Sequence, residues 1–318
     1  MTTDERVLIE LLKDTSLSYI SGEALAKALS VSRNSIWKAI EKLKKKGYSI
    51  TSVRGKGYKI KPGYDVLSKG IIKGDVTIFD SLPSTNDYIK RTDYKDSPQI
   101  VIANEQTKGK GRLGRYFFSP KGAGIYMSYS FKPKFIPEDT MLITCGVANV
   151  VLDSLLNISG EETKLKWVND IFLNGKKICG ILTEGEFNLE NNLFDRIIIG
   201  IGINCFPSEV PDDLKDIVGF LSETRKVSYT RNDIISDIIN GLDDLFVRKD
   251  TLDKDSIVSK YRENCFVVGK TVRLNTFSAE PAQVKILDIG DKCELIVEHL
   301  EGIKKGLIEN ISSGEIIL

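Results

Sequence analysis

Residues 105–115 alternate glycine with cationic side chains and form the segment of this 318-residue chain best suited to chemistry. The glycines are Gly109, Gly111 and Gly114, and the cations include Lys110, Arg112 and Arg115. Glycines let backbone amides approach an anion closely, while lysine and arginine supply positive charge. The segment therefore predicts a phosphate-binding loop, although a flexible basic surface loop would be the default interpretation if it stood alone.

The spacing of these glycines also fits the dinucleotide-binding fingerprint, but the context does not. An apolar strand is expected at 100–103, whereas 116–120 predict strand and turn instead of the helix that would hold a pyrophosphate. A Walker A loop and the kinase motifs His-Arg-Asp and Asp-Phe-Gly are absent from the sequence. The nucleotide-binding classes that depend on these motifs are therefore disfavoured.

Histidine and cysteine chemistry are also disfavoured. The one histidine, His299, is interpreted as structural or exposed, because no second histidine or matched cysteine could complete a zinc site. The cysteines contain no Cys-x-x-Cys pair and are expected to be reduced and structural: Cys145, Cys179, Cys205, Cys265 and Cys293. Charge stabilisation must then come from lysine, arginine, carboxylates or backbone amides, which suits phosphate and acyl chemistry.

Further motifs accompany the glycine-rich loop in a fixed order. They are Ser84-Thr85-Asn86, Phe118-Ser119-Pro120, Lys166-Trp167-Val168-Asn169-Asp170, Lys177-Ile178-Cys179-Gly180-Ile181-Leu182 and Gly200-Ile201-Gly202-Ile203-Asn204. The ordered set resembles the signature of biotin–protein ligases, several of which carry an N-terminal winged helix-turn-helix and act as the biotin operon repressor. The resemblance covers essentially the full chain.

The resemblance implies an activity in two steps. Biotin first displaces pyrophosphate from ATP to give biotinyl-5'-AMP, and a lysine of a biotin carboxyl carrier protein then attacks this mixed anhydride and releases AMP. Biotin, ATP and Mg²⁺ are the implied small-molecule partners. Two rival interpretations remain: a transcription factor whose body only senses a ligand, and a lipoate-type ligase.

The resemblance also assigns residues to the site. It places Ser84, Thr85, Asn86 and Gln106 at the ureido end of biotin, where hydroxyls and amides can satisfy its donors and acceptors. It places Gly109, Lys110, Gly111, Arg112 and Arg115 in a loop that folds over biotin and adenylate, and Lys177, with Gly180, at the carboxylate or the phosphate formed from it. It places Lys166, Trp167, Asn169, Asp170 and Asn204 on the nucleotide side, with Asp170 as the Mg²⁺ ligand. Arg112, Lys177, Lys166 and Asp170 are the residues implied to be catalytic.

The chain departs from the family pattern at two positions. Val168 stands where the family has proline, which is expected to cost only local rigidity. Lys110 stands where the family has arginine, so it keeps the charge but loses bidentate geometry. Affinity for the adenylate is the property that this second change is expected to alter.

The N-terminal region is strongly basic and predicts a DNA-binding head. Residues 1–62 carry 13 Lys and Arg against 6 Asp and Glu, a net charge of +7 in a chain whose total is +1. The pattern predicts a winged helix-turn-helix. Three helices are marked by a capping box at Thr2 and Glu5, by N-caps at Ser21 and Ser32, and by a helix end at Gly47. The wing is predicted from strands at 48–53 and 58–60 around a turn at 54–57. Ser32, Arg33, Asn34, Ser35 and Lys38 of the third helix, with Arg54 and Lys56 of the wing, are the expected DNA contacts. Trp37, on the same helix, is assigned to the core. The alternative interpretation of the whole N-terminal region is a protein-interaction domain with a solvated basic face.

The predicted fold is α+β and has three units, of which residues 1–63 are the winged helix-turn-helix. The resemblance implies that residues 64–268 form a mixed α/β ligase domain like that of class II synthetases. Short strands near 272–274, 284–287, 295–297 and 308–311 predict a small β-barrel at 269–318, which resembles the SH3-like C-terminal domain of the family. Pro62 and Gly63 mark the linker between the first two units, and residues 141–156 are expected to be a core helix.

Composition and the lack of targeting signals predict the location of the protein. The chain has 41% hydrophobic and 28% charged residues and shows neither a secretory signal nor a membrane span, so it is expected to be cytoplasmic and to have no membrane partner. The resemblance adds operator DNA and an adenylate-dependent homodimer as partners.

Overall fold

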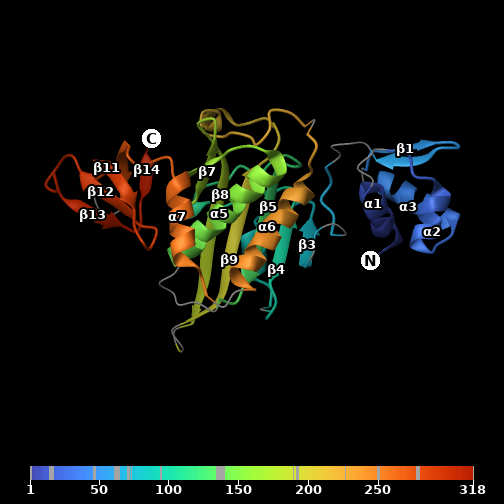
Figure 1. Cartoon of the computed structure of the whole chain (residues 1–318), viewed down its shortest axis with the longest axis horizontal. Coiled ribbons are helices and arrows are strands. Elements are labelled where there is room, and N and C mark those ends of the chain that lie inside the picture. Colours follow the sequence, from blue (N-terminus) through green and yellow to red (C-terminus); the bar gives the residue numbers. More distant parts are fainter. Residues whose placement is uncertain are drawn as a thin grey trace.

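The computed structural model describes residues 2–13, 18–45, 48–60, 65–69, 72, 74–93, 95–133, 140–188, 190, 193–225, 227–248, 251–276 and 280–317. The predicted helix end at Gly47 and the predicted linker at Pro62 and Gly63 lie outside these residues. Figure 1 shows the chain as a small head, a central sheet flanked by helices, and a tail of strands, in that order along its longest axis.

The head has the predicted helices and wing. It comprises α1 (Thr3–Lys13), α2 (Gly22–Leu29), α3 (Arg33–Lys45), β1 (Ile50–Val53) and β2 (Gly57–Ile60). The capping box at α1 is confirmed, because Glu5 accepts from the Thr2 backbone at 2.8 Å while its own N–H donates to the Thr2 hydroxyl. Ser21 and Ser32 cap α2 and α3 as predicted. The wing differs slightly, since its first strand begins at Ile50 instead of residue 48, and Gly57 belongs to the second strand and not to the turn.

The assignment of Trp37 to the core is wrong. The inward face of α3 consists of Ile36, Ala39, Ile40 and Leu43, each at most 5% exposed, whereas the Trp37 side chain is 53% exposed. These four residues follow helical spacing and already fill the stripe that faces α1 and α2. Trp37 therefore lies on the outward side of the helix.

A seven-stranded mixed sheet forms the body. Its order is β3 (Asp75–Phe79), β4 (Gln99–Ala103), β5 (Gly124–Phe131), β9 (Leu193–Asn204), β8 (Lys176–Asn188), β7 (Asp170–Leu173) and β6 (Lys164–Lys166). The β3–β4 pair is parallel and the other pairs are antiparallel. Helices α5 (Thr140–Ser159), α6 (Arg231–Phe246) and α7 (Lys254–Asn264) lie on one side of the sheet (Figure 1).

Residue alternation in the strands separates two apolar layers. Ile100, Ile102 and Ile199 belong to the main core that includes α5, while Val101 and Ile198, one residue out of step, pack with α4 (Thr85–Lys90). Helix α5 is long and apolar enough to cross a membrane, but 67% of its most apolar window is buried inside the fold. It is the core helix predicted at 141–156. The sheet thus places α4, which carries the first site motif, on the side opposite α5.

The tail is a five-stranded antiparallel sheet in the order β13 (Ile308–Ile311), β12 (Leu295–His299), β11 (Ala282–Ile289), β10 (Thr271–Asn275) and β14 (Glu315–Ile317). The predicted strands are confirmed, and β14 is an addition. The Trp167 indole N–H donates to the Cys293 carbonyl at 2.8 Å, which joins the body to the tail. His299 has the predicted structural environment, 2.8 Å from the Glu309 carboxylate, and all five cysteines are free and buried.

Candidate active site

A pocket of about 260 Å³ collects the sequence motifs at one end of the central sheet. Of the residues expected to bind biotin and nucleotide, it is lined by Ser84, Thr85, Asn86, Gln106, Lys110, Gly111, Arg112, Arg115, Lys166, Trp167, Asn169, Asp170, Lys177, Gly180 and Asn204. Gly109 is the exception. A Cβ at this position would lie 2.4 Å from the Phe117 carbonyl oxygen and 2.6 Å from the Ser119 hydroxyl. Gly109 therefore packs against the segment that follows the glycine-rich loop in the sequence.

One end of the pocket is a buried network of hydroxyls and amides around the start of α4. Ser84 caps the helix by accepting from the Asp87 N–H at 3.3 Å. The Gln106 side-chain oxygen accepts from the Thr85 backbone at 2.8 Å and from the Thr85 hydroxyl at 3.1 Å. These bonds hold Gln106 and Thr85 in fixed orientations at the pocket wall, as binding of a small polar group requires.

Two members of this network carried no sequence motif. Ser128 on β5 lies with its hydroxyl 2.7 Å from that of Thr85, and it donates to the side-chain oxygen of Asn86 at 2.5 Å. Asn86 donates in turn to Glu184 of β8 at 2.8 Å. A serine within the apolar run of β5 and a glutamate within a long strand have no local signal, so only the sheet topology reveals their positions.

The family resemblance places Thr85 and Asn86 at the ureido group of biotin, and Ser128 forms a buried hydrogen bond with each of them. Replacing Ser128 with alanine is therefore expected to weaken biotin binding by about tenfold. The Michaelis constant for biotin should rise while that for ATP stays nearly constant. Ser130→Ala is the matched control, since Ser130 is on the same face of the same strand and also buried, whereas the hydrogen bonds to Thr85 and Asn86 come from Ser128. Equal effects of the two substitutions on biotin would contradict the assignment.

The middle of the pocket is an apolar slot floored by glycines. A Cβ at Gly202 would lie 2.4 Å from the Phe117 ring, and one at Gly180 would lie 3.2 Å from it. Ile181, Leu182 and Ile201 also line the slot. The bare glycine positions on β8 and β9 therefore let the Phe117 ring, which also lines the pocket, lie close against the sheet.

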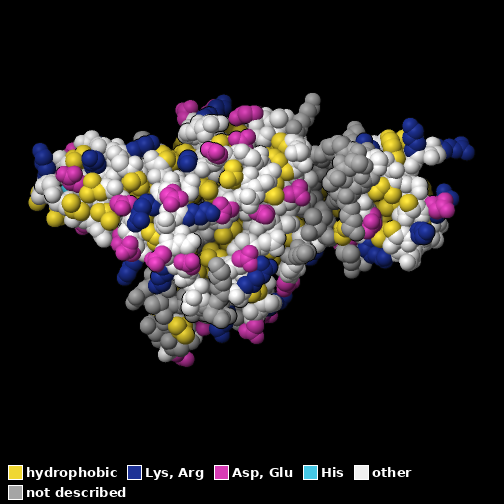
Figure 2. Space-filling model, viewed as in Figure 1, with side chains coloured by type: hydrophobic (Ala, Val, Ile, Leu, Met, Phe, Trp, Pro, Cys, Tyr) yellow, Lys and Arg dark blue, Asp and Glu magenta, His cyan; other side chains and the backbone are white. Residues whose placement is uncertain are grey.

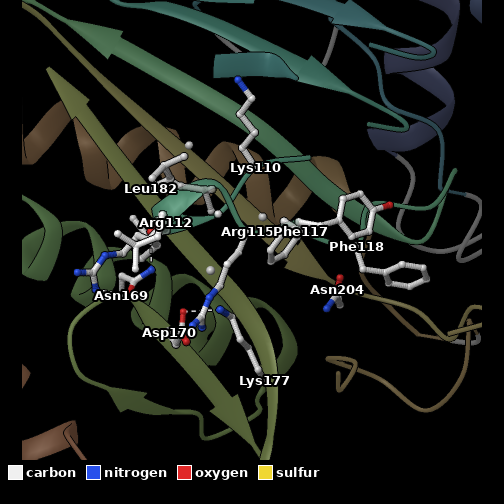
Figure 3. Close-up of a pocket in the computed structure, with 18 of the residues that line it drawn as sticks. Lys110, Arg112, Arg115, Phe117, Phe118, Asn169, Asp170, Lys177, Leu182 and Asn204 are labelled. Atoms are coloured by element: carbon white, nitrogen blue, oxygen red, sulfur yellow. Dashed lines mark hydrogen bonds and ion pairs between the residues drawn. The ribbon is translucent and has the colours of Figure 1, made fainter. Parts of the chain in front are cut away.

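The other end of the pocket gathers cations and amides (Figure 3). The Lys177 ammonium lies 2.5 Å from an Asp170 carboxylate oxygen. Arg112 donates to the Asn169 side-chain oxygen at 3.2 Å, and Asn169 is itself held by a 2.8 Å bond to the Ile181 carbonyl. Residues from three sequence motifs thus meet at this end of the pocket. They come from strands β7 and β8, from the turn between β6 and β7, and from the short helix η1 (Arg112–Gly114).

Lys166 lies beside this cluster and has an altered protonation equilibrium. Burial lowers the pKa of its ammonium below the usual 10.5, and the nearby charge of Lys177 lowers it further, although Asp170 opposes both effects. A lysine with a lowered pKa loses its charge as the pH rises toward 10.5.

The family resemblance places Lys166 on the nucleotide side of the site, so the adenylate formation that it implies is expected to decline on the alkaline side, starting below pH 10.5, as Lys166 becomes neutral and stops attracting phosphate. The pH profile of kcat/KM for ATP measures this. Lys166→Arg should flatten the decline, because arginine stays protonated throughout the range. An unchanged alkaline limb in Lys166→Arg would show that another group titrates there.

Two cations of the glycine-rich loop form ion pairs with neighbouring elements, Arg115 with the tail and Lys110 with α4. Arg115 forms a two-pronged ion pair with Glu315 of β14, and its second bond measures 2.6 Å. This pairing lowers the pKa of the Glu315 carboxyl. Lys110 instead pairs with Asp87 of α4 at 2.7 Å, and its side chain points away from the Asp170–Lys177 pair (Figure 3). The loop is thus held at both ends, and Glu315, 200 residues from Arg115, had no sequence signal.

The site offers few metal ligands. Among the residues that the structure describes, no group of three or more His, Cys, Asp or Glu side chains could hold a metal ion. Asp170 and Glu315 are the acidic residues of the pocket wall, and Glu315 is occupied by Arg115. Mg²⁺ commonly binds through one or two carboxylates together with substrate phosphates, so Asp170 fits a magnesium site that needs ATP for completion.

Most of the expected DNA contacts are exposed on the head. Arg33, Asn34, Lys38, Arg54 and Lys56 are exposed. Ser32 is also exposed and Ser35 is half-buried, and their hydroxyls lie 2.8 Å apart. Ser32 accepts from the Ser35 N–H as the helix cap. Figure 2 shows Lys and Arg side chains projecting from the end of the head that carries the wing. The cations are therefore free to meet a polyanion, while the two serines mainly fix the start of α3.

Comparison with known proteins agrees with this three-part organisation. Family models match residues 5–59 (HTH domain), 78–204 (biotin/lipoate A/B protein ligase family) and 267–318 (biotin protein ligase C-terminal domain). The biotin protein ligase of Aquifex aeolicus, solved in complex with biotin and ATP, superposes with a TM-score of 0.61 at 25% identity and covers 76% of this chain and 97% of its own. The fold and the site define a biotin protein ligase.

Relatives that match most of the chain identify the family within the biotin protein ligases. The bifunctional ligase/repressor BirA of Bacillus subtilis (strain 168) is 34% identical over 331 residues, covering 98% of this chain and 99% of the relative. The protein of the same name from Escherichia coli (strain K12) is 30% identical over 230 residues, which is 70% of each chain. The chain therefore belongs to the bifunctional ligase/repressor BirA family of biotin protein ligases.

Proposed function

We propose that the pocket activates biotin with ATP to give biotinyl-5'-AMP and then transfers biotin to one lysine of a biotin carboxyl carrier protein. The main support for this proposal is the order of environments along the pocket. It has a buried hydrogen-bonding end, an apolar slot lined by glycines, and a cationic end. Biotin has the same order of a ureido group, an apolar chain and a carboxylate. The Aquifex aeolicus relative, solved with biotin and ATP, supports both ligands.

The residues would act on the substrates as follows. Thr85, Asn86 and Gln106 bind the ureido group, and the biotin carboxylate then points toward Lys177 and Arg112. These cations offset the negative charge that accumulates when the carboxylate oxygen attacks the α-phosphorus and pyrophosphate leaves. Lys166 and Asn169 contact the nucleotide.

Mg²⁺, held by Asp170 and the phosphates of ATP, would supply further charge neutralisation in this step. In the second step, the carrier lysine must be neutral to attack the acyl carbon of the anhydride. We assign Asp170 as the carboxylate that helps to remove its proton, with AMP as the leaving group.

The regulatory half of the proposal concerns the head. We infer that residues 1–63 bind operator DNA of biotin synthesis or transport genes through α3 and the wing, that the adenylate-bound chain does so as a homodimer, and that the protein is cytoplasmic. The exposed Arg33, Lys38, Arg54 and Lys56 support DNA binding. Residues 64–268 and 269–318 complete the proposed division into domains.

The first step can be tested by pyrophosphate exchange. With biotin, ATP and Mg²⁺ present, labelled pyrophosphate should enter ATP, because adenylate formation is reversible. Lipoate in place of biotin should give little exchange, and this separates the lipoate-ligase alternative. Biotin binding without any exchange would instead favour a ligand-sensing regulator.

The head can be tested through salt dependence. Arg54→Ala is expected to weaken binding to DNA of any sequence and to lower the slope of log affinity against log salt by about one, because a phosphate contact is lost. Glu23→Ala is a surface control on the same head, for which no loss of affinity is expected. An unchanged slope in Arg54→Ala would remove the wing from the interface.

A further inference from the structure

Trp37 is a large apolar side chain on the outward face of α3, and nothing in the ligase site uses it. It is 53% exposed, while Ile36 and Ile40 of the same helix are completely buried. Single exposed apolar residues are common and carry no meaning alone. The position of Trp37 is the informative feature, because it lies four residues after Arg33 and next to Lys38, both exposed.

The surroundings of Trp37 select the kind of partner. Arg33 and Lys38 flank it on the helix, and Arg54 and Lys56 are exposed on the wing of the same head. Exposed cations on the helix and on the wing favour a polyanion over an apolar protein groove. Cations mainly contact phosphates, which fix the position of a protein on DNA without distinguishing sequences. Sequence discrimination must come from other exposed side chains, and Asn34 and Trp37 are such residues on the same helix as Arg33 and Lys38.

The indole has a specific complement in the major groove. An α-helix fits this groove, where thymine alone presents a methyl group among the four bases. An asparagine such as Asn34 can pair with adenine, whereas an exposed ring offers a broad apolar surface that matches the methyl group.

We infer that Trp37 is a specificity-determining residue of the head, whose indole packs on the 5-methyl group of a thymine in the operator. This inference rests on the proposed DNA binding and extends it to a single base feature. Removal of the ring should lower affinity for the operator but leave affinity for unrelated DNA nearly unchanged.

The experiment removes the methyl group and the ring separately. Duplexes are first selected from a random pool with the full-length protein in the presence of biotin, ATP and Mg²⁺, and each thymine of the selected site is then replaced by deoxyuridine. Because the proposed homodimer binds two symmetry-related half-sites, one thymine in each half-site should be sensitive to the replacement. Deoxyuridine at that position should weaken wild-type binding by about fourfold, the effect of losing one buried methyl group. In Trp37→Ala the same replacement should have no effect.

Two further measurements make the outcome decisive. Trp37→Ala should weaken the selected site by roughly tenfold and unrelated DNA by less than about twofold, whereas Arg54→Ala should weaken both alike. A flat deoxyuridine scan with wild-type protein, or equal methyl effects in wild type and Trp37→Ala, would overturn the role of Trp37 while DNA binding stands. No enrichment from the pool, with Arg54→Ala equal to wild type on all DNA, would overturn the DNA-binding proposal itself.

Discussion

Lys177→Ala is expected to slow biotinyl-5'-AMP formation by about 10²–10³-fold, the usual cost of removing one group that stabilises charge in the transition state. Lys177 pairs with Asp170 inside the pocket, so its removal deletes a cation from the place where the carboxylate and α-phosphate meet. It also leaves the partly buried carboxylate of Asp170 without this partner. Single-turnover formation of adenylate measures the effect.

The neighbouring lysine provides the control for this substitution. Lys176 is on the same strand but exposed, and its ammonium donates to the Lys215 carbonyl outside the pocket. Lys176→Ala should retain the wild-type rate within about twofold, as expected for a surface substitution. Lys177→Arg should recover part of the activity, because it restores the charge with a different shape. Comparable losses in Lys176→Ala and Lys177→Ala would contradict the role of Lys177.

Arg112→Ala is expected to slow the same step by about 10²-fold, because a preorganised charge-stabilising donor is lost. Arg112 is aligned by the Asn169 side chain, which is itself fixed to the Ile181 carbonyl. Asn169→Ala should therefore reproduce part of the loss by releasing the guanidinium. Isothermal titration with a non-hydrolysable biotinyl-adenylate analogue and single-turnover kinetics would separate binding from chemistry.

Lys110→Ala is the comparison for Arg112→Ala, since both residues belong to the glycine-rich loop. The Lys110 ammonium pairs with Asp87 and is turned away from the Asp170–Lys177 pair. Its removal should cost no more than about tenfold, the scale of one partly exposed ion pair. A larger loss in Lys110→Ala than in Arg112→Ala would show that the loop rearranges and exchanges the two cations when substrates bind.

Much of the fold was predictable because its signals are local. Capping residues such as Ser21, Ser32 and Thr2 mark helix starts, and apolar alternation marks the strands of the tail. Trp37 was misassigned because it follows Ile36 directly and both are apolar. Only the complete inward set of α3 shows which of the two neighbours faces the core.

The motifs of the site were predictable in type but not in their connections. The resemblance named Thr85, Asn86 and Gln106, yet Ser128 and Glu184 complete their network from strands that bear no motif. Glu315 reaches Arg115 through the docking of the tail, a contact between residues 200 positions apart. Such partners depend on sheet order and domain packing, which a single sequence does not encode locally.

The central claim is that one pocket both activates biotin and delivers it to a carrier lysine. The most direct measurement is the mass of a biotin carboxyl carrier domain after incubation with the full-length protein, biotin, ATP and Mg²⁺. We expect one biotinyl addition on a single lysine, which is absent when ATP is omitted and forms about 10²–10³-fold more slowly when Lys177→Ala replaces the wild type. A carrier of unchanged mass, with biotin bound to the wild-type protein, would contradict the account.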